Sequence, residues 1–137
     1  MTDVAMDYVA VTQRTHAHLF KPVSDRVLSD YQPWFDSLAD DVLLEYASPE
    51  GRGEFRGKEA VIDYISGLFS SLSGDEVIED VQLERDPEYV TKGERVVMLW
   101  RENTRNKQTG ATTPGKEVVL VMDYGDGKLQ RIRRFSQ

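Results

Sequence analysis

The sequence contains no cysteine, and its two histidines are His16 and His18. The lack of cysteine excludes disulfide bonds, thiolate nucleophiles and metal or iron–sulfur sites built on cysteine. The histidines are two positions apart, and side chains with this spacing do not share a face of a continuous helix. The sequence therefore predicts no metal site.

Positive charge is also scarce, because 17 Lys and Arg residues stand against 24 Asp and Glu residues, for a net charge of −7. Proteins bind nucleic acids and anionic membranes through an excess of basic side chains, so we expect neither partner. No apolar run approaches the roughly 20 residues of a membrane-spanning helix, and the N-terminal residues lack the pattern of a signal peptide. These absences predict a cytoplasmic protein.

The residues that are present suit a soluble globular chain. Of the 137 residues, 39% are hydrophobic and 30% are charged, which fits one domain that spans residues 1–137. The first half of the sequence has helical periodicity, and from residue 77 onward the pattern alternates with a period of two. This order predicts an α+β fold with an antiparallel sheet.

Three helices are predicted in the first half. Residues 4–19 form an amphipathic stripe that includes Tyr8, Val11 and His18, and Pro22 ends it. A second helix begins near residue 29 or 30 with Pro33 in its first turn, and a third spans residues 57–72. We expect the apolar faces of these helices to pack on the sheet.

The predicted strands cover residues 40–47, 77–84, 95–105, 116–124 and 128–135. Two of them, RVVMLWRENTR and KEVVLVMDY, are apolar on both faces in their centres. Strands of this kind are covered on both sides in folded proteins. Because three helices can cover one face, we expect a homodimer through the other face, where Val119 and Val121 lie.

The stretch GRGEFRGKEAV, residues 51–61, has the glycines of a phosphate-binding loop without its spacing. A P-loop requires a first glycine where this sequence has Arg52, and a hydroxyl where it has Glu59. The glycines also miss the dinucleotide-binding pattern. We therefore expect a turn before the third helix, with no nucleotide and no other cofactor.

The order of these elements resembles the NTF2-like superfamily, and most closely its SnoaL-like branch. The resemblance rests on LADDVLLEYASP, GEFRGKEAV, ERVVMLW and YGDGKLQRIRRF, and it covers residues 27–135. It implies a cystatin-like or NTF2-like cone, in which a curved antiparallel sheet of mixed topology wraps around three helices from the N-terminal half. It also implies an apolar pocket with the glycine stretch at its rim, and dimers that form through the sheet.

The superfamily includes isomerases, cyclases, dehydratases, epoxide hydrolases and non-catalytic binding proteins, and their catalytic residues do not carry over to this chain. Where ketosteroid isomerases have two aspartates, this sequence has Tyr46 and Leu120. Where the polyketide cyclases have a His and an Asp, it has Met122 and Ser136. Function must therefore be judged from the site itself.

Two residues are candidates for catalysis. His18 lies on the apolar stripe of the first helix and, with an ordinary pKa of about 6.5, suits proton transfer near neutral pH. Tyr46 shares a strand face with Val42 and Leu44 and can donate a hydrogen bond to a ligand oxygen. The alternatives are a histidine bonded to a backbone carbonyl at the edge of the core and a tyrosine packed at the rim.

The remaining candidates are residues that would bind the substrate. His16 takes the place of His18 if the helix is shifted. Leu120, Met122 and Tyr124 line one face of a strand with Val118. Arg101 belongs to a group of charges at the sheet ends, which either form ion pairs or anchor a ligand carboxylate; the others in this group are Glu102, Arg131, Arg133 and Arg134.

Two main hypotheses follow. The first is a SnoaL-like enzyme that uses cofactor-independent general acid–base chemistry, of the isomerase, cyclase or hydrolase type, on an apolar cyclic or polyketide-like molecule. The second is a non-catalytic domain that binds a small hydrophobic ligand, or a dimeric adaptor. The missing carboxylates favour the second hypothesis, and a histidine on the inner face of the first helix favours the first.

Overall fold

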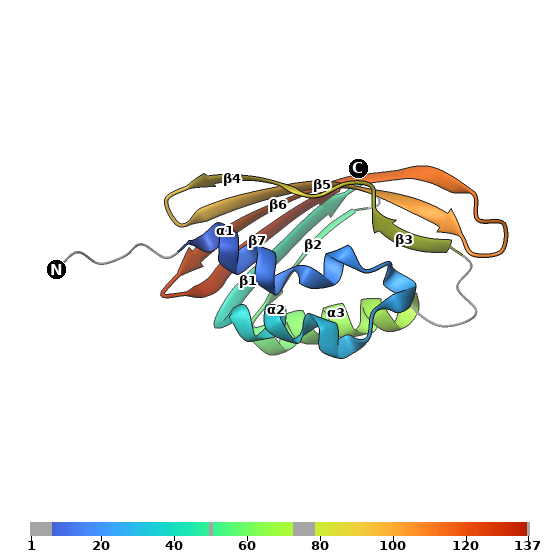
Figure 1. The fold of residues 1–137 in the computed structure, drawn as a ribbon. Coiled ribbons are helices and arrows are strands. Elements are labelled where there is room, and N and C mark those ends of the chain that lie inside the picture. Colours follow the sequence, from blue (N-terminus) through green and yellow to red (C-terminus); the bar gives the residue numbers. More distant parts are fainter. Residues whose placement is uncertain (1–6, 50, 73–78, 137) are drawn as a thin grey trace.

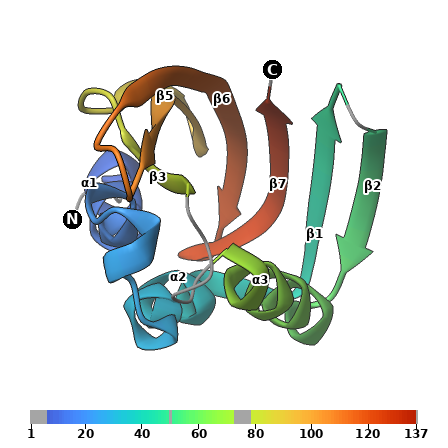
Figure 2. The ribbon, with the colours of Figure 1, turned by 90° about the vertical axis from the view of Figure 1, so that its right-hand side faces the viewer.

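The computed structural model describes residues 7–49, 51–72 and 79–136. Three α-helices lie on the concave side of a curved, unclosed sheet, as the α+β prediction requires (Figures 1 and 2). The helices are α1 (Tyr8–Thr15), α2 (Gln32–Ser37) and α3 (Lys58–Leu72). Within the described ranges, no helix is long and apolar enough to cross a membrane.

The sheet has seven strands, and β2, β1, β7, β6, β5 and β3 follow one another across it, with β4 also paired to β5. The β1–β7 pair is parallel, whereas the other neighbouring pairs that the structure describes are antiparallel. This confirms a curved sheet of mixed topology. The strands are β1 (Leu38–Ser48), β2 (Gly51–Arg56), β3 (Glu79–Leu83), β4 (Glu88–Lys92), β5 (Arg95–Asn106), β6 (Thr112–Gly125) and β7 (Lys128–Ser136).

The first helix is shorter than the sequence pattern predicted. It ends at Thr15, and a separate 3₁₀ turn follows at Ala17–Phe20, while residues 4–6 lie outside the described part of the chain. His16 forms the junction between the two, with φ −109° and ψ 20°. The break changes the helical period, so His16 and His18 are both buried although they are two residues apart.

The glycine stretch is a strand and not the predicted turn. Residues Gly51–Arg56 form β2, which pairs antiparallel with β1 and places Gly53 opposite Tyr46. A Cβ atom at position 53 would lie 2.7 Å from the Tyr46 hydroxyl, so glycine here leaves room for the tyrosine ring. The turn comes at Gly57, whose φ of 91° suits glycine and whose N–H donates to the Val42 carbonyl.

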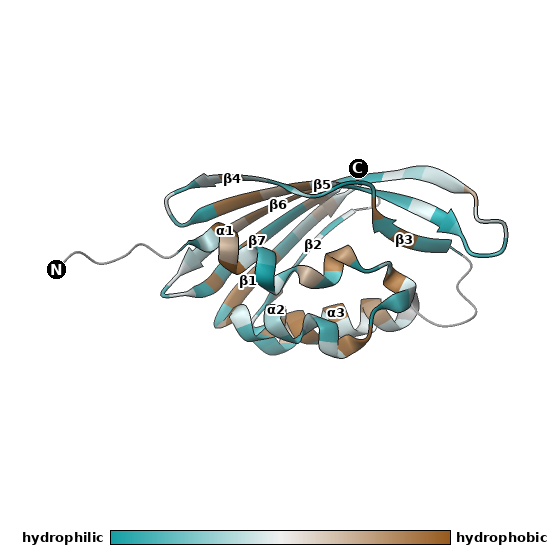
Figure 3. Cartoon of the chain, viewed as in Figure 1, coloured by the Kyte–Doolittle hydropathy of each residue, from teal (hydrophilic) through white to brown (hydrophobic). Residues whose placement is uncertain are grey.

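The core lies between the helices and the concave face of the sheet. The predicted inner face of β6 is confirmed, because Val118, Leu120, Met122 and Tyr124 are all buried. Hydrophobic residues concentrate in the central parts of β5 and β6 and along α3 (Figure 3). On the opposite face of β6, Val119 and Val121 are partly exposed.

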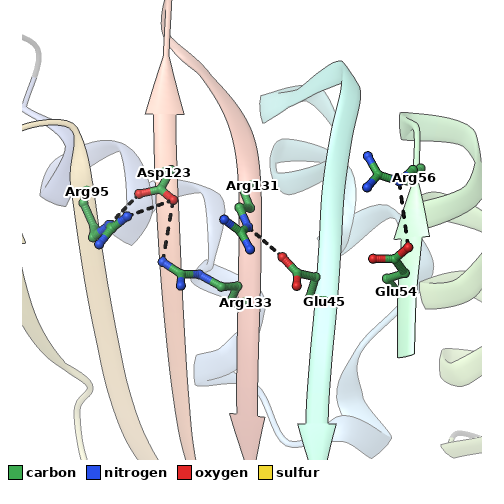
Figure 4. A network of polar contacts seen from close by, with 7 residues as sticks. All are labelled: Glu45, Glu54, Arg56, Arg95, Asp123, Arg131 and Arg133. Atoms are coloured by element: carbon green, nitrogen blue, oxygen red, sulfur yellow. Dashed lines mark hydrogen bonds and ion pairs between the residues drawn. The ribbon is translucent and has the colours of Figure 1, made fainter. Parts of the chain in front are cut away.

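Charged side chains form pairs across the convex face of the sheet, with the helices behind it (Figure 4). Arg95 and Arg133 flank Asp123 at 2.6 and 3.9 Å, and Arg131 pairs with Glu45 at 2.6 Å. Exposed pairs of this kind contribute little stability each. They do, however, give carboxylate partners to Arg95 on β5 and to Arg131 and Arg133 on β7, which point away from the core.

Candidate functional site

A cavity of about 670 Å³ lies between the helices and the concave face of the sheet. Its walls come from the segment after α1, from α2 and α3, and from the inner faces of β1, β3, β5, β6 and β7. This volume falls within the range of roughly 300–1,000 Å³ that is usual for small-molecule sites. Both tryptophans of the chain, Trp34 and Trp100, line it.

His16 lines this cavity with a fixed tautomer. Its Nδ1 lies 2.9 Å from the Thr12 carbonyl oxygen and 3.1 Å from Thr15 Oγ1. Because the carbonyl can only accept, the shorter contact requires that Nδ1 carries the proton and donates. Nε2 therefore presents a lone pair; it is buried and has no hydrogen-bond partner among the described residues. Burial lowers the pKa of His16 to about 4, against an opposing contribution from the Thr12 hydrogen bond.

His18 lines the cavity as well, beside the ring of Tyr31 at a centroid distance of 4.2 Å. Its Nδ1 is buried, also without a hydrogen-bond partner in the described residues. Burial, followed by the proximity of His16 and Arg26, lowers the pKa of His18 to about 3. The expectation that His18 titrates near neutral pH is therefore wrong, because the folded chain removes the ring from water; both imidazoles are neutral at pH 7.

Tyr46 lies on the inner face of β1 and belongs to a cluster of three stacked rings. Its ring centroid is 5.8 Å from that of Tyr64 on α3 and 6.1 Å from that of Phe55 on β2. Tyr46 and Tyr64 both line the cavity. Burial, and then the nearby Tyr46, raise the pKa of Tyr64, whereas the charge of Arg134 acts in the opposite direction. The Tyr64 phenol thus stays protonated at neutral pH, and the hydroxyls of Tyr46 and Tyr64 can both donate hydrogen bonds here.

Arg134 lines the cavity as well, and the sequence analysis named it within a group of charges at the sheet ends. It lies on β7 between two other lining residues, with Tyr46 as its register partner on β1 and Leu120 on β6. The alternation of the strand carried the necessary signal. Since Ile132 is buried on the inner face, the residue two positions later shares that face.

The other predicted residues divide between the cavity, the core and the surface. Leu120 lines the cavity. Met122 is fully buried and Tyr124 bonds Thr12 Oγ1 at 2.7 Å, and neither lines the cavity. Arg101 lies outside it and pairs with Glu84 and Glu117, at 3.8 and 3.7 Å. Of the proposed site, the structure thus brings His16, His18, Tyr46 and Leu120 together around one cavity.

A buried carboxylate holds one wall of the cavity in place. Asp80 on β3 is 2% exposed and accepts hydrogen bonds from the Ser24 backbone and hydroxyl, at 2.9 and 2.6 Å. Although burial raises its pKa, the hydrogen bonds from Ser24 and Val81 outweigh that effect and keep the pKa below its usual value. The 3₁₀ turn Val23–Asp25, which contributes Val23 to the cavity wall, is thereby fixed to β3.

No protein-family model matches the chain, and no curated protein sequence matches it either. Solved structures do match over nearly the whole length. An NTF2-like protein from Anabaena variabilis is 16% identical with a TM-score of 0.69, and the match covers 100% of this chain and 94% of that one. The chain has the NTF2-like fold.

Two further structural neighbours have names that refer to a reaction. A protein from Bacillus subtilis, provisionally named an isomerase, is 15% identical with a TM-score of 0.63, over 94% of this chain and 85% of its own. A protein from Xanthomonas campestris, provisionally named a polyketide cyclase, is 17% identical with a TM-score of 0.63, over 93% and 87% of the two chains. Similarity at this level concerns the fold.

The donors in the cavity determine what chemistry it can perform. Within the described ranges, no three His, Asp or Glu side chains are grouped as metal ligands would be. The polar groups of the cavity include two neutral imidazoles on the segment after α1, and two phenols and a guanidinium on α3, β1 and β7. The lining also contains Tyr31, Arg26, Lys116, Glu79 and Glu102. Such an arrangement can accept a proton and can donate hydrogen bonds to a ligand oxygen.

Proposed function

We propose that this chain is a cofactor-independent enzyme that performs general acid–base chemistry, of the isomerase, cyclase or hydrolase type, on a small cyclic molecule. The observation that carries the proposal is the pair of imidazoles, each with a buried nitrogen that has no partner among the described residues, in a cavity that Tyr46 also lines. The provisional names of the Bacillus and Xanthomonas neighbours support the same class.

We assign each group a role from its position in the cavity. His16 Nε2 is the proton acceptor, because the Thr12 carbonyl fixes the proton on Nδ1 and aligns the ring. The ring of His18 lies near that of His16, with 6.0 Å between the two centroids, and His18 can exchange a second proton with the ligand. Tyr46 donates to the oxygen on which negative charge develops when a proton is removed next to a carbonyl.

The low pKa values of the histidines favour a second candidate function, a non-catalytic domain that binds a small hydrophobic ligand. An imidazole whose conjugate acid has a pKa of about 3 or about 4 is a weak base. General acid–base catalysis is most efficient when the pKa lies near the working pH. The two functions differ in whether a bound ligand loses a proton.

Proton exchange on a bicyclic ketone, 2-tetralone, distinguishes the acid–base enzyme from the non-catalytic binding domain. In D₂O, an acid–base enzyme should exchange the protons next to the carbonyl faster than buffer alone, as followed by NMR. Binding can be measured separately from the fluorescence of Trp34 and Trp100, which line the cavity. The proposal predicts exchange at pH 7 together with saturable quenching.

Variants test the assigned roles. His16→Gln and His18→Gln should each reduce the exchange rate by about 10²-fold, the usual scale for loss of a general acid or base, with little change in binding. Tyr46→Phe should also reduce it, whereas the control Tyr89→Phe, on β4 and outside the cavity, should not. Binding without exchange in the unaltered protein would replace the enzyme with the binding domain.

A further inference from the structure

The three arginines of β7 have different environments. Arg131 and Arg133 point to the convex face, where they pair with Glu45 and Asp123. Arg134 points to the concave face, lines the cavity and has no hydrogen bond or ion pair with any described residue. Since no described carboxylate pairs with it, this guanidinium has donors available for the acceptor group of a ligand.

The charges of the cavity wall run against those of the whole chain. The net charge of the protein is −7, yet the lining includes three cationic side chains, Arg26, Lys116 and Arg134, and two carboxylates, Glu79 and Glu102. Arg26 donates to the Lys21 carbonyl and the Tyr31 hydroxyl, which are neutral acceptors, so its positive charge adds to that of the other two cations. The lining is therefore positive in an acidic protein.

The surroundings of Arg134 fit a planar anion. Figure 2 shows β7 and β1 side by side, with α3 beneath their lower ends. Tyr46 on β1 and Tyr64 on α3 stack with nearly parallel rings, at an interplanar angle of 6°. The planar fork of a guanidinium matches a carboxylate through two parallel hydrogen bonds, and phenol groups beside it add neutral donors that do not oppose the negative charge.

We propose that the ligand of this cavity carries a carboxylate, which Arg134 binds beside Tyr46 and Tyr64, and that its cyclic body extends toward the histidines. The inference rests on the proposed small-molecule function and specifies its ligand class. The body of the ligand would pack on the aromatic walls that Trp34 and Trp100 provide. A carboxylate at one end would thus orient the reactive part toward His16 and His18 at the other.

A matched pair of probes tests this inference: 2-naphthoate and its neutral amide, 2-naphthamide, which differ in charge and little in shape. Isothermal titration calorimetry should show that the unaltered protein binds 2-naphthoate at least about tenfold more tightly. Arg134→Gln should remove that preference and leave the affinity for 2-naphthamide unchanged. Arg131→Gln, which removes the same charge from the convex face of the same strand, should preserve the preference.

The outcomes separate the two proposals. Equal affinity of the unaltered protein for both probes overturns the carboxylate site and leaves a small-molecule cavity standing. A preference that survives Arg134→Gln, or that Arg131→Gln removes equally, overturns the role of Arg134. Failure of both probes to bind overturns the carboxylate site and counts against the proposed small-molecule function as well.

Discussion

When the pH is lowered, the buried histidines should make the protein lose stability before its carboxylates become protonated. In the folded state the pKa of His16 is lowered to about 4 and that of His18 to about 3, whereas an unfolded histidine has a pKa of about 6.5. As the pH falls below 6.5, the unfolded chain binds protons that the folded chain does not. Stability is therefore complete above that pH and falls as the pH is lowered toward the folded pKa values.

The size of the loss follows from these values. Between pH 7 and pH 5 each histidine destabilises the fold by roughly 2 kcal/mol, at about 1.36 kcal/mol for each pH unit over which the two states differ by one proton. The two together give about 3–4 kcal/mol, a large share of the 5–15 kcal/mol that is typical of a whole domain. Asp30, Glu45 and Asp80 have lowered pKa values, so their contributions are lost at more acidic pH, outside this range.

Urea unfolding at pH 7 and pH 5, followed by tryptophan fluorescence, measures the effect. The unaltered protein should lose about 3–4 kcal/mol of unfolding free energy between pH 7 and pH 5. The single variant His18→Gln should lose about half as much, and the double variant that carries both His16→Gln and His18→Gln should lose close to none. Equal stability of the unaltered protein at both pH values would refute the reasoning. So would a full loss in the double variant, because the protons would then bind elsewhere.

Two further predictions concern the packing around Tyr46 and the convex face of the sheet. Gly53→Ala should destabilise the protein by about 1–3 kcal/mol in urea unfolding and weaken ligand binding, because the added methyl group clashes with the Tyr46 ring. The control Gly67→Ala should do neither, because nothing lies within 4 Å of its new Cβ atom. We also predict a homodimer through the convex face, where Val119 and Val121 are partly exposed. Light scattering at micromolar concentration should then give twice the 15.6 kDa of one chain, and Val121→Lys should give a monomer. A single-chain mass for the unaltered protein would contradict the dimer.

The parts of the fold that local patterns determine could be predicted from the sequence. The period of two in β6 correctly placed Leu120 and Met122 on the inner face, and α3 has nearly the predicted bounds. The strand at residues 51–56 was missed because its two glycines, with Gly57 directly after it, favour turns, and its pairing with β1 depends on a separate segment. Pairing between segments is a tertiary property that glycine content does not reveal.

The site was predicted less completely, for reasons that lie in the three-dimensional packing. A continuous helix would place His16 and His18 on different faces, and the break at His16 brings both to the cavity. Their lowered pKa values depend on burial, which the order of residues alone does not supply. Arg134 was named only within a group of charges, although alternation from Ile132 gives its face; nothing in the sequence shows that Arg131 and Arg133 find partners and Arg134 does not.

Three polar side chains, each with a group that lacks a partner among the described residues, border the cavity. His16 Nε2 and His18 Nδ1 have no partner among the described residues, and the Arg134 guanidinium has no acceptor there. A buried polar atom without a hydrogen bond costs about 1–3 kcal/mol, and the buried histidines add a further cost below pH 6.5. A ligand with a donor at one end would give the histidine nitrogens a partner, and a carboxylate at the other end would give one to Arg134. Part of its affinity would then come from hydrogen bonds to polar groups that lack a partner in the free protein. The charge of the ligand should therefore matter more than its apolar area.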